Sequence, residues 1–258
     1  MSSTGKPATG RGAFVTAAAS IQFRKRGGPP PGHCFFVSVH IPKTAGTTLG
    51  LVLDRVFRKR VLMDYPDNPL EDRCDPQIAA HADFITGYFR GIHGHFSARR
   101  HLATFPAAKR IATVRHPVDR VISQYLHELN DDGAASAYHR AIRDGMTVVD
   151  FAAAPGVGDA MTRFLAGVEL ADYDLLLLSD RLGDGLHVLN YVLGNLDIPQ
   201  HFGSPPALPR ENLGTARARV VPFNAATRAA IFARVGADAE TYARAQQLFA
   251  QKVRRHLG

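Results

Sequence analysis

CFFVSVHI at residues 34–41, followed by PKTAGTT at residues 42–48, is the segment from which the fold of this chain is predicted. The first eight residues are apolar, β-branched and aromatic and end at Pro42, which is the pattern of a short buried strand. Beyond the loop, apolar side chains recur at helical spacing on one face. They are Leu49, Val52, Leu53, Val56 and Phe57. The segment therefore predicts a strand, a loop and a helix in direct succession.

The loop between this strand and this helix has the composition of an anion cradle. Free N–H groups at a helix N-terminus and the helix dipole favour an anion there, and small residues let the backbone approach it. The candidate residues are Lys43, Thr44, Ala45, Gly46, Thr47 and Thr48. An ordinary strand-to-helix turn with a solvated lysine is the alternative interpretation.

The P-loop motif of nucleotide triphosphatases, GxxxxGK[ST], does not match this loop. In that motif the lysine stands directly before the hydroxyl at the helix start, whereas Lys43 here precedes Ala45 and Gly46. A P-loop-type nucleotide kinase or triphosphatase nevertheless stays as an alternative function, because it shares the same succession of strand, loop and helix.

A second segment repeats this arrangement further along the chain. Residues 109–114 predict a strand, and Arg115-His116-Pro117 is a turn that leads into a helix with proline near its first position. Arg120 and Ser123 are neighbours on one face of that helix and, with Arg115, predict a second anion site, because a guanidinium fork binds two phosphate oxygens at once. A surface helix with ion pairs to Asp119 and Glu128 is the alternative.

The net charge of +8 suggests a polyanion as partner, but its distribution argues against nucleic acid. Residues 1–33 hold five basic and no acidic side chains, and residues 216–258 hold eight basic and two acidic ones. The stretch between them carries −3. We therefore predict a disordered basic segment at 1–33 and a single domain at 34–258, with no nucleic-acid partner. A non-catalytic polyanion-binding protein is a further alternative.

The apolar runs are short, and the longest, such as residues 175–178, cannot span a bilayer. Polar residues interrupt the faint apolar stretch at 13–23, and basic residues follow it, so export is not expected. The sequence thus predicts a cytoplasmic protein without integral membrane contact.

Both segments resemble the sulfotransferase superfamily, whose donor is 3′-phosphoadenosine 5′-phosphosulfate (PAPS). HIPKTAGTTL at residues 40–49 is similar to its 5′-phosphosulfate loop, and RHPVDRVISQY at residues 115–125 is similar to its 3′-phosphate motif, R-x-P-x-x-R-x-x-S-x-Y. The residues of both motifs are most similar to those of the carbohydrate branch, which includes the heparan sulfate 2-O and 6-O sulfotransferases and bacterial relatives. The resemblance implies an α/β fold, P-loop-like and three-layered, with a central parallel sheet flanked by helices.

The resemblance also implies a role for each candidate residue. Lys43 and the loop hold the 5′-phosphosulfate and neutralise the leaving phosphate, while Arg115, Ser123 and Arg120 hold the 3′-phosphate. Residues 211–217 resemble a late loop that closes over the nucleotide, although Gly214 is an extra residue there. That loop adds Thr215 and Arg217 as nucleotide ligands.

Two histidines in the segment GIHGHFS, residues 91–97, are candidates for the general base. In an extended stretch His93 and His95 point to the same face, and a neutral imidazole suits proton transfer near pH 7. The resemblance supports this, since the heparan sulfate enzymes carry their catalytic histidine in a similar setting. We predict His95 first and His93 second. An H-x-H pair can bind a metal, but no third ligand cluster stands near it, so no metal is predicted.

The predicted reaction is transfer of the sulfuryl group from PAPS to a hydroxyl of an acceptor, without a metal. The resemblance points to a glycan or glycolipid as acceptor. The segments expected to bind it, 61–82 and 130–158, carry no readable specificity code.

Overall fold

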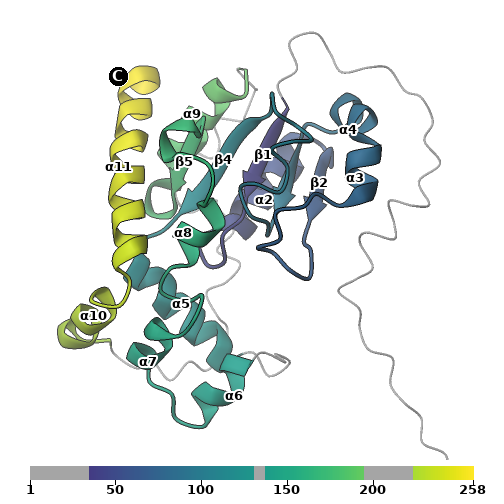
Figure 1. Cartoon of the computed structure of the whole chain (residues 1–258). Helices are drawn as coiled ribbons and strands as arrows, with labels where there is room; N and C mark the ends of the chain where they lie inside the picture. Colours follow the sequence, from purple (N-terminus) through teal and green to yellow (C-terminus); the bar gives the residue numbers. More distant parts are fainter. Residues whose placement is uncertain (1–34, 131–136, 195–222) are drawn as a thin grey trace, which may run out of the picture.

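The computed structural model describes residues 35–130, 137–194 and 223–258. Its centre is a five-stranded sheet, β2-β3-β1-β4-β5, in which each pair of neighbouring strands is parallel (Figure 1). The strands are β1 (Phe36–Val39), β2 (Val61–Asp64), β3 (Gly91–Gly94), β4 (Lys109–Val114) and β5 (Leu175–Leu178). β1 therefore lies in the middle, with β3 on one side and β4 on the other.

Helices flank this sheet, so the predicted three-layer α/β fold is confirmed (Figure 1). The helices are α2 (Gly46–Val56), α3 (Pro76–Ala80), α4 (Ala82–Tyr88), α5 (Pro117–Asn130), α6 (Ala137–Arg143), α7 (Val148–Ala153), α8 (Ala160–Leu165), α9 (Leu182–Val192), α10 (Ala225–Phe232) and α11 (Gly236–Leu257). Two short 3₁₀ turns, η1 (Leu170–Asp172) and η2 (Ser179–Arg181), flank β5.

The predicted strands and helices around the two motifs are present. β4 has the predicted bounds, β5 coincides with the apolar run at residues 175–178, and α2 and α5 follow β1 and β4 directly. β1 is shorter than the predicted 34–41, since it ends at Val39 where the chain turns into the loop. The amide of His40 still donates to the carbonyl oxygen of Gly94 at 2.7 Å, so the end of β1 stays attached to β3.

The core has two parts. The larger one surrounds the sheet, and β1 and β5 are buried along their whole length. The smaller one lies between α5, α6, α7 and α10, and includes Val121, Phe151 and Ile231. Figure 1 shows these helices below the sheet and α11 running beside α9 and β5. The rigid sheet thus carries the segments that follow β1, β3 and β4.

Some predictions fall outside the described residues. They are the basic segment 1–33, Thr215 and Arg217. Within the described ranges, no helix has both the length and the apolarity needed to cross a membrane.

Candidate functional site

The candidate residues gather where the carboxyl ends of three adjacent strands meet. Parallel strands end at the same edge of a sheet, and ligands of open α/β folds bind in the crevice there. β1 leads into the Lys43 loop, β4 leads into Arg115, and β3 leads into His95. Motifs far apart in the sequence are therefore neighbours in space.

The loop after β1 has a strained and well-supported backbone. Lys43 and Ala45 adopt left-handed conformations, with φ of 67° and 70°. The buried Thr44 hydroxyl donates to the carbonyl oxygen of Ile41 at 2.9 Å, which ties the loop to the strand end. Strain of this kind persists where the surroundings fix it and is common at ligand sites.

The N-terminus of α2 presents its amides without a side-chain cap. Ala45 precedes the helix and supplies no capping hydrogen bond. The first N–H groups of an α-helix lack partners within the helix, so this end favours an anion. Gly46 is the first helical residue, and a Cβ there would lie 1.8 Å from the His40 ring. Only glycine fits between the helix start and this imidazole.

Arg115 and Lys43 form a cationic pair at the junction of β1 and β4. The Arg115 guanidinium donates to the carbonyl oxygen of Lys43 at 3.2 Å. Burial lowers the pKa of Lys43, and the charge of Arg115 lowers it further, while Glu128 opposes this. Burial also lowers the pKa of Arg115, against the charges of Asp119 and Asp180. Two half-buried cations side by side would be stabilised by an anion between them.

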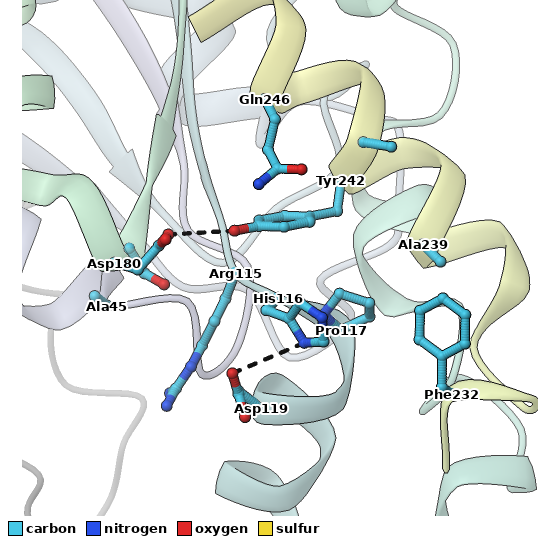
Figure 2. A pocket seen from close by; sticks show the side chains of 12 residues that line it. Ala45, Arg115, His116, Pro117, Asp119, Asp180, Phe232, Ala239, Tyr242 and Gln246 are labelled. Carbon is cyan, nitrogen blue, oxygen red and sulfur yellow. Dashed lines mark hydrogen bonds and ion pairs between the residues drawn. The ribbon is translucent and has the colours of Figure 1, made fainter. Parts of the chain in front are cut away.

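A pocket of about 800 Å³ adjoins this pair, and Arg115 and Ala45 form part of its wall (Figure 2). α11 supplies the opposite wall through Tyr242 and Gln246, and the Tyr242 hydroxyl donates to Asp180 at 3.3 Å. This volume is in the range of small-molecule sites, roughly 300–1,000 Å³. The pocket is therefore large enough for a nucleotide moiety.

Three histidine rings pack together at the ends of β1 and β3, on the side of β1 away from β4. His40 stacks on His93 with ring centroids 5.3 Å apart, and meets His95 edge-on at 4.1 Å. Tyr65, just after β2, completes the cluster, since its ring lies 5.0 Å from His95 and its hydroxyl 3.3 Å from His40 Nδ1.

The two candidate bases differ in accessibility. His93 is fully buried, and its Nε2 donates to the carbonyl oxygen of Gly46 at 3.1 Å, which leaves Nδ1 to accept from Ser38 Oγ at 3.0 Å. Both ring nitrogens of His93 are thus engaged inside the protein. His95 is only partly buried.

Burial keeps this cluster uncharged. It lowers the pKa of His93 to about 4 and that of His95 to about 4. It lowers the pKa of His40 to about 2, with the neighbouring histidines and Lys43 adding to the shift. Neutral imidazole at pH 7 is the form that accepts a proton.

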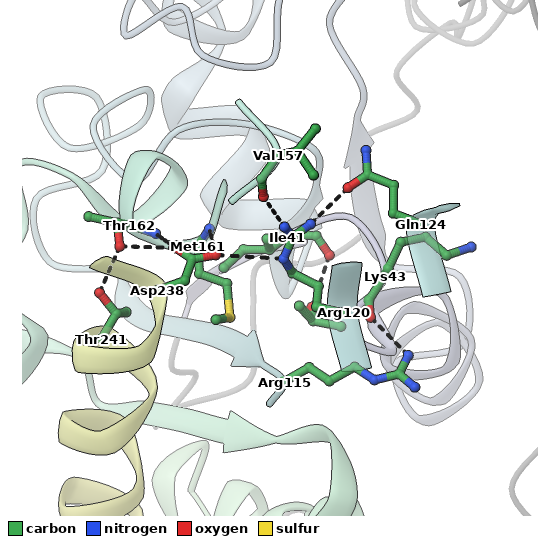
Figure 3. A network of polar contacts seen from close by, with 11 residues as sticks. Ile41, Lys43, Arg115, Arg120, Gln124, Val157, Met161, Thr162, Asp238 and Thr241 are labelled. Carbon is green, nitrogen blue, oxygen red and sulfur yellow. Dashed lines mark hydrogen bonds and ion pairs between the residues drawn. The ribbon is translucent and has the colours of Figure 1, made fainter. Parts of the chain in front are cut away.

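Arg120 does not take the position predicted for it. It is fully buried, its guanidinium donates to Gln124 at 2.8 Å and to the carbonyl oxygen of Val157, and it lies 3.6 Å from Asp238 (Figure 3). The physical reason is that Asp238, from α11, forms an ion pair with it in the interior. We therefore correct the expectation that Arg120 faces a bound anion.

The other residues of the second motif are differently placed. Ser123 is half-buried on α5, three positions beyond Arg120, and Arg115 is hydrogen-bonded to the Lys43 loop. Asp119 pairs with Arg228 at 2.6 Å rather than with a partner in its own helix.

Thr47 and Thr48, two hydroxyl residues of the first motif, lie at the start of α2. Thr47 is exposed and Thr48 is half-buried.

Comparison with known proteins identifies the family. The model of the sulfotransferase family matches residues 32–205. The chain belongs to the sulfotransferase family. No curated protein matches the chain. The matched region contains both motifs and the His93-Gly94-His95 segment, whereas α10 and α11 of this sulfotransferase lie beyond it.

Two residues of the site were missed by sequence reasoning. His40 was treated as part of a strand, although Gly46 six residues later signals a close approach to something bulky. Tyr65 follows β2, which was not predicted. In the part of this sulfotransferase that the structure describes, no group of three or more acidic, histidine or cysteine side chains is arranged to hold a metal ion.

Proposed function

We propose that this sulfotransferase moves the sulfuryl group of PAPS to a hydroxyl of a saccharide or glycolipid, with His95 as general base. The observation that carries the proposal is the hydrogen bond between Arg115 and the Lys43 loop, at the carboxyl ends of β1 and β4. His95 follows β3, which lies on the other side of β1 from β4. Donor and acceptor groups are thus expected on opposite sides of one central strand.

The donor is held in three places. The uncapped amides of α2, with Lys43 and the Thr44, Thr47 and Thr48 hydroxyls, bind the 5′-phosphosulfate. Arg115 and Ser123 bind the 3′-phosphate, which distinguishes PAPS from ATP. The pocket between Arg115 and α11 is large enough to take the adenosine.

The reaction is an in-line displacement at sulfur. His95 takes the proton of the acceptor hydroxyl while that oxygen forms its bond to sulfur. The bond between sulfur and the bridging phosphate oxygen breaks, and its electron pair stays on the leaving nucleotide. Lys43 stabilises the negative charge that grows on that oxygen.

The surroundings favour His95 over His93 in this role. A base needs a free nitrogen within hydrogen-bond reach of the proton that it takes. Both nitrogens of His93 already have protein partners, and the ring is fully buried. We therefore assign His93 to positioning the start of α2, through its bond to Gly46.

Lys43→Ala tests the donor site. With ³⁵S-labelled PAPS and a panel of neutral and anionic glycans, glycolipids and phenols, we expect transfer to fall at least 100-fold, because one positioned charge of this kind contributes about 10²–10³ in rate. Lys252→Ala on α11 removes a lysine outside the site and should keep wild-type transfer. ATP hydrolysis without PAPS-dependent transfer would favour the nucleotide kinase or triphosphatase alternative.

A further inference from the structure

The acceptor hydroxyl proposed above must reach His95 along a surface whose composition can be read. It is formed by residues 64–75, after β2, and residues 95–101, after β3, which we name the β2–β3 rim. The buried members of the rim, which support its surface from inside, are Asp64, Phe96, Ser97, Ala98, Arg100 and His101. The two parts are tied together, since Ser97 Oγ donates to Asp72 at 2.6 Å and Arg100 donates to the carbonyl oxygen of Arg73 at 2.7 Å. The rim is therefore a fixed wall beside the base.

The β2–β3 rim is negatively charged. It holds five carboxylates and three guanidinium groups, for a net charge of −2 with its histidines neutral. The carboxylates are Asp64, Asp67, Glu71, Asp72 and Asp75.

Each arginine of the β2–β3 rim is matched to a carboxylate of the same rim. Arg100 is buried against Asp64 at 2.8 Å, and its charge therefore stays inside the protein. The other two pairs are Arg73 with Glu71 at 3.2 Å and Arg99 with Asp72 at 3.3 Å. An anionic acceptor would thus approach a wall whose cations are already neutralised, and like charges oppose its approach.

Tyr65 gives the rim an aromatic face next to the base. Its side chain is 47% exposed, and its ring lies 5.0 Å from that of His95. The contact of its hydroxyl with His40 Nδ1 at 3.3 Å holds the ring in place. The electron-rich face of an aromatic ring packs well on the C–H groups of a pyranose, which carry partial positive charge. A sugar seated on Tyr65 would therefore lie close to His95.

From these two features we infer that the acceptor is an uncharged pyranoside stacked on Tyr65, and that the β2–β3 rim excludes glycans containing uronic acid or sulfate. This inference rests on the proposed sulfotransfer. It makes Tyr65 and the carboxylates of the rim the determinants of acceptor specificity.

The first test compares two sets of acceptors with labelled PAPS. Cellotetraose and xylotetraose are neutral, whereas hyaluronan and heparosan tetrasaccharides carry uronates. We expect kcat/KM at least tenfold higher for the better neutral acceptor than for either anionic one. Equal or greater rates with the anionic pair overturn the inference.

The second test changes the rim. Asp67→Lys should raise the ratio of kcat/KM for the uronate acceptors to kcat/KM for the neutral ones at least fivefold, because Asp67 is exposed two residues after Tyr65. Glu240→Lys makes the same change of charge at an exposed position on α11 and should leave this ratio unchanged. No gain with Asp67→Lys contradicts the role of the rim.

Tyr65 itself is tested by two substitutions. Tyr65→Ala should raise KM for the neutral acceptor about tenfold with a smaller effect on kcat, whereas Tyr65→Phe keeps the stacking face, loses only the contact with His40, and should raise KM less than threefold. Equal KM values for wild type and Tyr65→Ala contradict the stacking role.

Binding of 3′-phosphoadenosine 5′-phosphate, measured by calorimetry, separates the two levels of the proposal. Nucleotide binding without transfer to either acceptor set overturns the uncharged pyranoside and leaves the donor site standing. Absence of nucleotide binding overturns the proposed function itself.

Discussion

The pKa of His95, the proposed general base, lies well below that of an ordinary histidine. Burial lowers its pKa to about 4, so the ring is neutral throughout the physiological range. We expect kcat to be nearly constant from pH 8 to pH 5.5 and to fall only as the pH approaches 4, since protonation removes the base. A kcat profile measured with saturating PAPS, with near-UV circular dichroism at each pH to detect unfolding, checks this. An acid limb centred near pH 6.5 would contradict it.

The position of a site residue could be predicted where it depends on the strand and loop to which that residue itself belongs. Lys43 lies beside the end of its own strand, so a sequence pattern could place it, and the contact with Arg115 follows from two strands ending at one edge. Arg120 was misplaced because its partner Asp238 lies far along the chain, and helical spacing does not reveal which face meets α11. For the missed residue His40, Gly46 signalled a close approach, but the sequence did not show that the His40 ring is the group that the helix start approaches.

The joint between β1 and α2 depends on Gly46. Since a Cβ would sit 1.8 Å from the His40 ring, Gly46→Ala must displace either the helix start or the imidazole. We expect a loss of stability of about 1–3 kcal/mol, typical of overpacking, and a large loss of transfer.

Gly87→Ala is the matched control for this substitution, because Gly87 also lies in a helix and a Cβ there meets no atom within 4 Å. Alanine favours helix over glycine, so stability should be unchanged or rise by up to about 1 kcal/mol. Equal urea midpoints for Gly46→Ala and wild type would contradict the close packing of His40.

The contact between α5, α8 and α11 depends on one buried ion pair. Asp238 accepts from the amides of Met161 and Thr162 at 3.1 and 2.9 Å and faces Arg120 at 3.6 Å (Figure 3). Asp238→Ala leaves the Arg120 charge buried without its partner, so we expect a loss of about 3–5 kcal/mol in urea unfolding.

The double variant Arg120→Met/Asp238→Ala removes the uncompensated charge and should be less destabilised than the sum of its single variants. The exposed pair Arg181–Asp184, at 2.7 Å, serves as comparison, and Asp184→Ala should cost no more than about 1 kcal/mol. Strictly additive losses would show that the Arg120–Asp238 pair is not coupled.

Elements with a clear apolar pattern were predicted, whereas the edge strand β2 was not. α2 and α5 have clear apolar faces, β4 coincides with the strand predicted at residues 109–114, and β5 is an uninterrupted run of four leucines. β2 spans only Val61–Asp64 and fell within a segment assigned to acceptor binding. Four residues are too few to show a period, and pairing with β3 is a long-range interaction. The Tyr65 side of the site was therefore missed.

The molecule as a whole should lose stability in mild acid. Burial lowers the pKa of His93 to about 4, whereas a histidine in the unfolded chain has a pKa near 6.5. Between these values the unfolded state binds more protons, so stability is complete above about pH 6.5 and decreases as the pH falls towards 4. At pH 5 this one histidine lowers stability by on the order of 2 kcal/mol relative to pH 8.

Urea unfolding from pH 8 to pH 4.5 measures this decrease. His93→Gln should reduce the dependence without abolishing it, because His40 and His95 also have lowered pKa values, and replacement of the exposed His81 by Gln should leave it unchanged. A stability that stays constant down to pH 5 would be inconsistent with a neutral, buried His93.

The net charge of the whole chain is distributed unevenly along the sequence. Residues 1–33 carry +5 and residues 216–258 carry +6, whereas the matched family region lies mostly in the stretch between them, which carries −3. The few cations of the candidate site, Lys43 and Arg115, lie just after the carboxyl ends of β1 and β4. Their number fits one small anionic donor better than an extended polyanion.

Transfer of sulfate by wild type, His95→Ala and His93→Ala is the measurement on which the proposed function depends. With PAPS and a neutral saccharide, mass spectrometry should show product that has gained one SO₃ unit, formed at least 100-fold more slowly by His95→Ala, since a general base contributes about 10²–10⁴ in rate. Binding of 3′-phosphoadenosine 5′-phosphate should be unchanged in that variant, and His93→Ala should lose stability. Near-normal turnover by His95→Ala, or no PAPS-dependent product from wild type, would contradict the assignment.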